Sequence, residues 1–164
     1  MFVDFKSLSK ESRVWIFQSI KSIENQTIEK IKSKLQLFLD DWKSHQMNFK
    51  SSFEIRNNTF IIIAADESNL VSGCSIDSLI KFIKELEYLF DLQLMDKLHV
   101  KYILNDEIQT KHLNDFKILC KSLENNQELM VFNNLVKNIF ELNHNWNVDV
   151  RESWHKKYLK WIVY

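Results

Sequence analysis

Apolar residues along the chain recur with two periods, one typical of strands and one typical of helices. Arg13 to Ser19 is rich in β-branched and aromatic residues, which favours a strand. From Thr27 to Trp42 the apolar residues recur every three or four positions, so they lie on one face of a helix. The polar stretch from Lys43 to Lys50 is predicted to be a loop.

The next segment predicts a β-hairpin. Ser51 to Arg56 alternates between apolar and polar residues, as an edge strand does. Asn57 and Asn58 can adopt the positive φ angles that a two-residue hairpin turn needs. Thr59 to Ala65 is continuously apolar, which is typical of a strand buried on both faces.

A second helix, Ser75 to Phe90, and another alternating strand, His99 to Leu104, follow the hairpin. The order strand, helix, strand, strand, helix, strand is that of a ferredoxin-like fold. That topology has the first and third strands in the centre of the sheet, and the first and third candidates are the most apolar here. The sequence therefore predicts an α+β fold with a ferredoxin-like βαββαβ core over about residues 13–104. Its antiparallel sheet carries the helices on one face.

The remaining residues, about 105–164, predict a C-terminal α/β extension packed on this core within a single domain, 1–164. Glu107 to Thr110 suggests a short strand and Asn114 to Leu123 a helix. Leu129 to Val136 fits either a strand or the start of a helix. Val150 to Trp161 predicts a last helix, with four apolar residues on one face: Val150, Trp154, Tyr158 and Trp161.

Composition narrows the function classes. Lys plus Arg and Asp plus Glu both number 22, so the chain is formally neutral and lacks the charge of a general nucleic-acid binder. Its two cysteines, Cys74 and Cys120, form no disulfide framework, which suits a reducing compartment. The N-terminus shows no signal peptide, and the longest apolar run, Phe60 to Ala65, is too short to cross a bilayer. We therefore expect a soluble, cytoplasmic protein without a membrane partner and without a cofactor.

Several segments resemble a family of small uncharacterised bacterial proteins, and the resemblance runs nearly end to end. They are SSFEI..NTFIIIAADES, SGCSIDS, VFNNLV and ESWHKKYL. Members of this family are often labelled ABC transporter ATPase. Such an ATPase needs the glycine-rich loop GxxxxGK[ST], whose amides hold the phosphates. This chain has one glycine, Gly73, where average usage predicts about 11, and Cys74 rather than Lys follows it. The resemblance thus implies a family and no ATPase activity.

The loop that leads into the second helix holds the best candidates for chemistry. Ser75 is a suitable N-cap for that helix, and Cys74 would lie at its positive end, where a thiolate is favoured. Gly73 would let a ligand approach the backbone closely. The candidate ligand-binding residues are Asp66, Glu67, Ser68, Ser72, Gly73, Cys74, Ser75 and Asp77.

The local charge opposes an anion at this loop. No Lys or Arg occurs from Asn57 to Ile80, whereas Asp66, Glu67 and Asp77 are acidic. Asp77 would oppose a thiolate at Cys74 and repel a phosphate, so the acidic residues fit a divalent cation or an amine better. In the alternative interpretation, the glycine forms a tight turn, the serine caps the helix and the cysteine packs as a small apolar residue. The five histidines show no metal-binding spacing, and no metal site is predicted.

The C-terminal segment combines basic and aromatic residues. It contains Arg151, Lys156, Lys157 and Lys160, interleaved with Trp154, Tyr158 and Trp161. Such a set can bind single-stranded nucleic acid by charge and stacking. The RNA-binding module with ferredoxin-like topology has a characteristic aromatic motif on its central strands, and that motif is absent here. In the alternative interpretation, the rings dock the helix and the lysines face water.

These patterns predict a non-enzymatic binding or interaction module with a protein or small-molecule ligand. The expected surface is the acidic segment 66–78, or the open face of the sheet. One alternative is a small enzyme with Cys74 as nucleophile and His155 or another histidine as base. The other is an RNA-binding accessory protein, whose binding would weaken steeply with salt.

Overall fold

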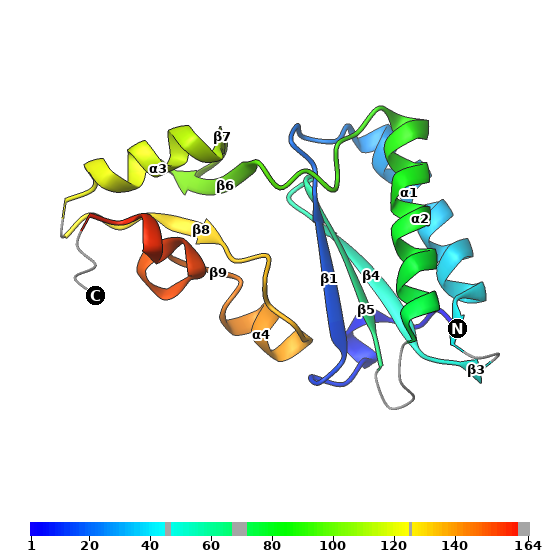
Figure 1. The fold of residues 1–164 in the computed structure, drawn as a ribbon. Helices are drawn as coiled ribbons and strands as arrows, with labels where there is room; N and C mark the ends of the chain where they lie inside the picture. Colours follow the sequence, from blue (N-terminus) through cyan, green and yellow to red (C-terminus); the bar gives the residue numbers. More distant parts are fainter. Residues whose placement is uncertain (45–46, 67–71, 125, 161–164) are drawn as a thin grey trace. The chain divides into compact units, whose positions relative to one another are not determined.

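The computed structural model describes residues 1–44, 47–66, 72–124 and 126–160. It is a mixed α/β structure with antiparallel sheets of three and four strands (Figure 1). The chain divides into two compact units. The first unit is Met1–Asp96 with Lys137–Phe140, and the second is Lys97–Val136 with Glu141–Tyr164. No helix in the described ranges is long and apolar enough to span a membrane.

The sheet of the first unit has the strand order β1-β5-β4, with β1 at Arg13–Gln18, β4 at Ser51–Arg56 and β5 at Phe60–Ala65. All six residues of β5 are buried, which confirms the prediction from its continuous apolar run. Asn57 and Asn58 have φ angles of 54° and 51°, so the predicted two-residue turn joins β4 to β5.

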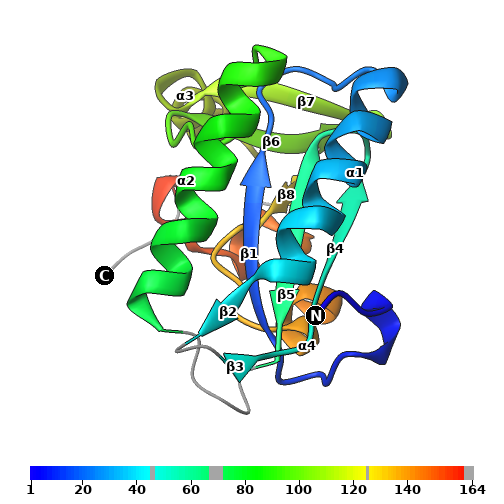
Figure 2. The ribbon, with the colours of Figure 1, turned by 90° about the vertical axis from the view of Figure 1, so that its right-hand side faces the viewer.

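Two long helices, α1 (Asn25–Asp41) and α2 (Gly73–Phe90), cover one face of this sheet (Figure 2). Each helix buries one apolar stripe, as its period predicts, against side chains of β1 and β5 such as Phe17, Ile61 and Ile63. Burial of each Leu or Ile of this kind stabilises the fold by about 1.5–3 kcal/mol. The buried helix residues include Ile31, Leu35, Leu39, Leu79, Ile83 and Leu86.

The predicted ferredoxin-like order of four strands is not confirmed. Three strands do follow it, because β5 lies antiparallel between β1 and β4. The expected fourth strand, β6 (His99–Leu104), belongs to the other sheet. The edge of β1 is instead hydrogen-bonded to a later segment: Val14 donates to the carbonyl of Lys137 over 2.9 Å, and Ile139 donates to that of Ser12 over 3.0 Å.

The sheet of the second unit has the order β7-β6-β8-β9. Asn105 and Asp106 have φ angles of 53° and 62°, so a two-residue turn pairs β6 with β7 along six positions. The hairpin places β7 on one edge of β6, and β8 occupies the other edge, so β6 has no free edge for β1. The helix α3 (Leu113–Ser122), predicted within one residue at each end, buries Phe116 and Cys120 in this unit's core. The other strands here are β7 (Glu107–His112), β8 (Met130–Phe132) and β9 (Asn147–Asp149). The short helix α4 (Ile139–His144) begins in the first unit and ends in the second.

The predicted last helix is wrong. Two 3-10 turns replace it, η3 (Val150–Glu152) and η4 (Trp154–Tyr158), with the extended residue Ser153 between them. The side chain of Asp149 accepts from the amide of Arg151 over 2.9 Å, and Ser153 Oγ accepts from the amide of His155 over 3.2 Å. Such side-chain bonds give the backbone an alternative to a continuous helix. Trp161 lies outside the described residues.

The segment predicted as a loop after α1 also contains a short strand pair, β2 (Lys43–Ser44) and β3 (Met47–Asn48). The 3-10 turn η1 (Phe5–Ser7) lies near the N-terminus. Neither feature has a clear signal in the apolar pattern, because both are too short to show a period.

Candidate functional site

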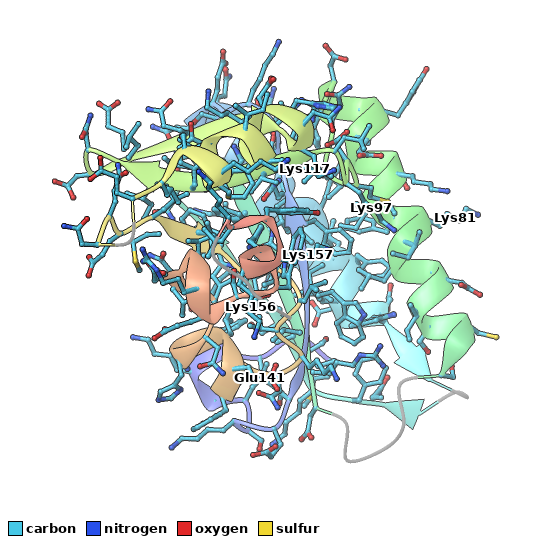
Figure 3. All side chains as sticks on the ribbon, turned by 60° about the vertical axis from the view of Figure 1, so that its left-hand side comes forward. Lys81, Lys97, Lys117, Glu141, Lys156 and Lys157 are labelled. Atoms are coloured by element: carbon cyan, nitrogen blue, oxygen red, sulfur yellow. The ribbon has the colours of Figure 1, made fainter. Side chains whose placement is uncertain are left out.

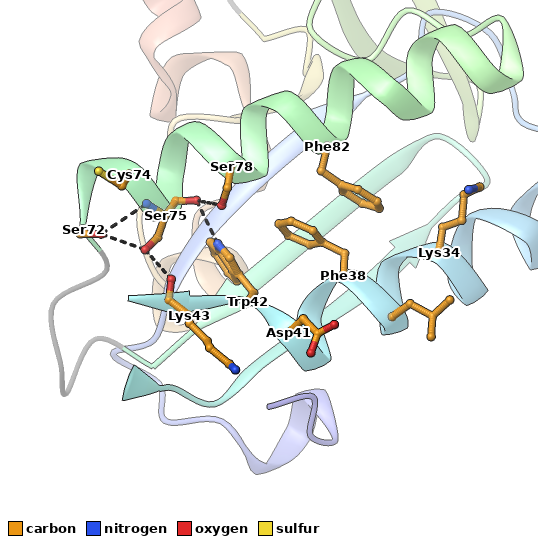
Figure 4. Close-up of a pocket in the computed structure, with 11 residues that line it drawn as sticks. Lys34, Phe38, Asp41, Trp42, Lys43, Ser72, Cys74, Ser75, Ser78 and Phe82 are labelled. Carbon is orange, nitrogen blue, oxygen red and sulfur yellow. Dashed lines mark hydrogen bonds between the residues drawn. The ribbon is translucent and has the colours of Figure 1, made fainter. Parts of the chain in front are cut away.

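A groove of about 780 Å³ lies between α1 and the N-terminal half of α2 in the first unit (Figure 4). Its aromatic side chains come from both helices: Phe38 stacks on Phe82 with ring centroids 4.3 Å apart and planes within 8°. Leu37, on its rim, is 71% exposed. The lining residues are Lys34, Leu37, Phe38, Asp41, Trp42, Lys43, Ser72, Cys74, Ser75, Ser78 and Phe82.

The polar end of this groove is built around Ser75. The helix α2 begins at Gly73, so Ser72 and not the predicted Ser75 is its N-cap. Ser72 Oγ accepts from the amide of Ser75 over 3.3 Å. Ser75 itself is buried, and its Oγ donates to the carbonyl of Lys43 over 2.8 Å. Its carbonyl accepts from Trp42 Nε1 over 2.9 Å, so the start of α2 is tied to the end of α1 (Figure 4).

Cys74 is exposed in the first turn of α2 and lines the groove. Cys120 is fully buried in the second unit, and burial raises the pKa of its thiol to about 11. The two cysteines therefore differ in access to solvent, and burial also keeps the Cys120 thiol neutral at physiological pH.

Native alkylation should separate them. At pH 7.5 we expect iodoacetamide to modify Cys74 more than about 100-fold faster than Cys120, because only an accessible thiolate reacts. Mass spectrometry of timed samples measures both rates, and the same reaction in urea gives the control in which both thiols are accessible. Equal rates under native conditions would contradict this placement.

The other predicted residues do not form one cluster. Gly73 has no positive φ, and a side chain there would meet no atom within 4 Å, so neither a turn nor a close approach requires glycine. Asp77 is exposed and lies beyond the first turn of α2. The amide of Asp66 donates to the carbonyl of Lys50 over 2.9 Å. Glu67 and Ser68 lie outside the described residues.

Metal-ligating side chains are not gathered into a site within the described ranges, which contain no group of three His, Cys, Asp or Glu residues able to hold an ion. The acidic residues around the start of α2 thus carry no coordination geometry that the structure describes.

His155, considered as a base for Cys74, is a buried residue of the second unit's core. Its Nδ1 lies 2.8 Å from Ser153 Oγ, and its ring stacks on Trp154 at 3.8 Å. Burial, and secondarily the charge of Lys157, lowers its pKa to about 4. This environment is that of a structural histidine. The one histidine of the first unit, His45, lies outside the described residues.

The predicted basic residues have different environments. Arg151 Nη1 donates to both carboxylate oxygens of Asp149 over 3.0 Å, and Nη2 donates to the carbonyl of Gln127 over 2.7 Å. This arginine is thus neutralised by its neighbour. Lys156, Lys157 and Lys160 are exposed. Trp154 and Tyr158 are partly buried, whereas Trp161 lies outside the described residues.

Lys101 is a notable residue that sequence reasoning missed. It lies on β6 with 3% exposure, and its Nζ donates to Thr110 Oγ1 over 2.7 Å. Burial lowers its pKa to about 8. The alternation over His99 to Leu104 predicted an edge strand, but β6 lies between β7 and β8, so the sequence has no local signal for the burial of Lys101.

Comparisons with known proteins add no relative: no protein-family model, no curated protein and no solved structure matches the chain. The resemblance to a bacterial family therefore stays a prediction, and proposals about function rest on the residues themselves.

Proposed function

We propose that this protein is a non-enzymatic binding module and that the groove between α1 and α2 is its binding surface. The observation that carries the proposal is the lining of the groove: aromatic rings from two helices, with hydroxyl groups at one end. Ligand sites are mostly apolar concavities of about 300–1,000 Å³ with a few placed polar groups, and this groove falls within that range.

The ligand is expected to present an apolar group beside a hydrogen-bonding group. Phe38 and Phe82 offer ring surface, and the Ser78 hydroxyl, already bonded to the Ser75 carbonyl over 2.7 Å, marks the polar end. Leu37, an exposed residue on the rim of the groove, adds apolar surface beside the rings, as is common at sites for protein partners. We therefore propose an apolar side-chain cluster of a partner protein, or an apolar small molecule, as ligand.

Binding of the fluorescent apolar probe 8-anilinonaphthalene-1-sulfonate tests the groove. We expect saturable binding to the native protein and at least fivefold weaker binding in Ser78→Arg, because an arginine there would fill the polar end. Leu37→Gln should weaken binding about two- to fivefold by removing apolar surface from the rim. Fluorescence titration gives the dissociation constants, and circular dichroism confirms the fold of each variant.

The matched control is Leu89→Gln, which removes a 46% exposed leucine of α2 that does not line the groove. Its affinity for the probe should equal that of the parent protein. Absence of saturable binding by the parent, or an equal loss in the Leu89 variant, would show that the groove is not the binding surface.

The first alternative is an enzyme with Cys74 as nucleophile. The exposure of this thiol in the first turn of α2 supports it. A catalytic cysteine needs a base within hydrogen-bond reach, and the described part of the first unit contains no histidine. Rapid alkylation of Cys74 well below pH 8.5 would move this alternative ahead of the binding module.

The second alternative is an RNA-binding accessory protein. The exposed lysines Lys156 and Lys157 support it, whereas the pairing of Arg151 with Asp149 weakens it. Titration of single-stranded RNA at rising salt distinguishes it, because binding through phosphates weakens steeply. For either function we propose action in the cytoplasm, since both cysteines are free thiols.

A further inference from the structure

A separate pocket of about 520 Å³ in the second unit is surrounded by lysines. Lys117 and Lys121 come from α3, one turn apart and hence on the same face of the helix. Lys157 comes from η4, so residues about forty positions apart in the chain contribute to one basic surface (Figure 3 labels Lys117 and Lys157). The complete lining is Lys117, Lys121, Lys157, Tyr158, Leu159 and Lys160.

Two of the ammonium groups, those of Lys117 and Lys157, lie over aromatic rings. Lys117 Nζ lies 5.3 Å from the centroid of the Tyr158 ring, and Lys157 Nζ lies 5.1 Å from the same centroid. Lys157 Nζ also lies 4.9 Å from the centroid of Trp154. These are cation–π distances, and such contacts hold a lysine head in place without neutralising it.

Three of the lysines in this pocket, Lys117, Lys121 and Lys157, have no ion pair among the described residues. Like charges gathered around one pocket repel one another, and an anion between them would remove that cost. The chain as a whole is neutral, so this is a local excess rather than a general basic character.

We propose that this pocket binds a compact polyphosphate, namely two linked phosphate groups, either as free pyrophosphate or as the diphosphate of a nucleotide. Lysine is a common phosphate ligand that acts as a point charge, and several lysines match the several charges of a diphosphate. The proposal concerns the second unit and does not depend on the groove of the first.

The same residues do not suit single-stranded nucleic acid. Base stacking needs a free ring face. His155 stacks on Trp154 at 3.8 Å, and Lys157 lies over that ring as well. Lys117 and Lys157 both lie over Tyr158. The rings therefore position the ammonium groups and are not an open platform for bases.

Calorimetric titration of the full chain with sodium pyrophosphate tests the proposal. We expect saturable binding that weakens at least tenfold in the double variant K117Q/K157Q and is largely retained in K117R/K157R, which keeps both charges. The control K81Q/K84Q replaces two exposed lysines of α2 and so changes the net charge by the same amount. It should bind pyrophosphate with the affinity of the parent protein. Thermal unfolding of each variant confirms that it is folded.

Further ligands identify the source of the phosphates. Binding of ADP and pyrophosphate but not of AMP supports a diphosphate site, and tighter binding of ADP would assign the ligand to nucleotides. No binding of either diphosphate overturns the proposal, as does an equal loss in K81Q/K84Q. Binding of a twelve-residue oligothymidylate without binding of pyrophosphate would also overturn it and favour nucleic acid.

Discussion

Replacement of Lys101 by methionine is expected to stabilise the protein at pH 7 by about 2 kcal/mol. Burial lowers the pKa of this lysine from 10.5 to about 8, so the folded state holds its charge at a cost of about 3 kcal/mol. Methionine removes that cost. It also loses the hydrogen bond to Thr110 Oγ1, and this loss reduces the expected gain by about 1 kcal/mol. Methionine also retains the length of the apolar stem.

The stability gained by K101M should decrease as the pH rises, because the pKa of Lys101 is lowered in the folded state. Between pH 8 and pH 10.5 the unfolded chain holds a proton that folded Lys101 has lost, so the parent protein gains stability as the pH rises. Urea unfolding at pH 7 and pH 10 should therefore show the advantage of the variant disappearing at the higher pH. The exposed Lys84 provides the control Lys84→Met, which should change stability by less than about 0.5 kcal/mol. If K101M is less stable than the parent protein at pH 7, the prediction that the buried charge of Lys101 destabilises the fold is wrong.

Acidification should destabilise the protein through His155. Its pKa is lowered from 6.5 to about 4, first by burial and then by Lys157. Between these values the unfolded chain binds a proton that the folded state excludes, so stability is lost as the pH falls. From pH 7.5 to pH 5 this residue alone is expected to lower the free energy of unfolding by about 2 kcal/mol.

The variant His155→Phe isolates this contribution. Phenylalanine keeps a ring between Trp154 and Phe116 but cannot bind a proton, and it loses the contact with Ser153. Its unfolding free energy in urea should be lower than that of the parent at pH 7.5 and should change much less between pH 7.5 and pH 5. The exposed His144 supplies the control His144→Gln, which should retain the pH dependence of the parent. An unchanged slope in His155→Phe would show that another group causes the acid sensitivity.

The candidate sites were only partly visible in the sequence. The sequence indicates the segment leading into α2 as a place where polar side chains meet a helix terminus, and Ser72, Cys74 and Ser75 line the groove. The groove itself could not be predicted, because Phe38 and Phe82 read as members of two separate apolar stripes until the helices are packed. The single-domain organisation of residues 1–164 stays a prediction.

The basic residues illustrate the same limit. Arg151 and Lys157 are both basic residues of one segment, yet Arg151 is paired with Asp149, whereas Lys157 lines a pocket whose described lining contains no acid. The spacing of Lys117 and Lys121 indicates a basic helix face, since lysines four residues apart lie on the same side of a helix. Only the fold shows that this face meets Tyr158.

What the sequence determined by itself is local. The apolar periods specified α1, α2, α3 and β5, and the Asn57-Asn58 pair specified a hairpin, because helix faces, buried strands and two-residue turns depend on neighbours within a few residues. The tertiary structure alone decided that β6 pairs with β7 and β8, that Lys101 is buried and that the C-terminal segment forms 3-10 turns. In each case several segments could supply the hydrogen-bond or packing partner. Which one does so depends on which distant segments occupy the remaining strand edges and surfaces.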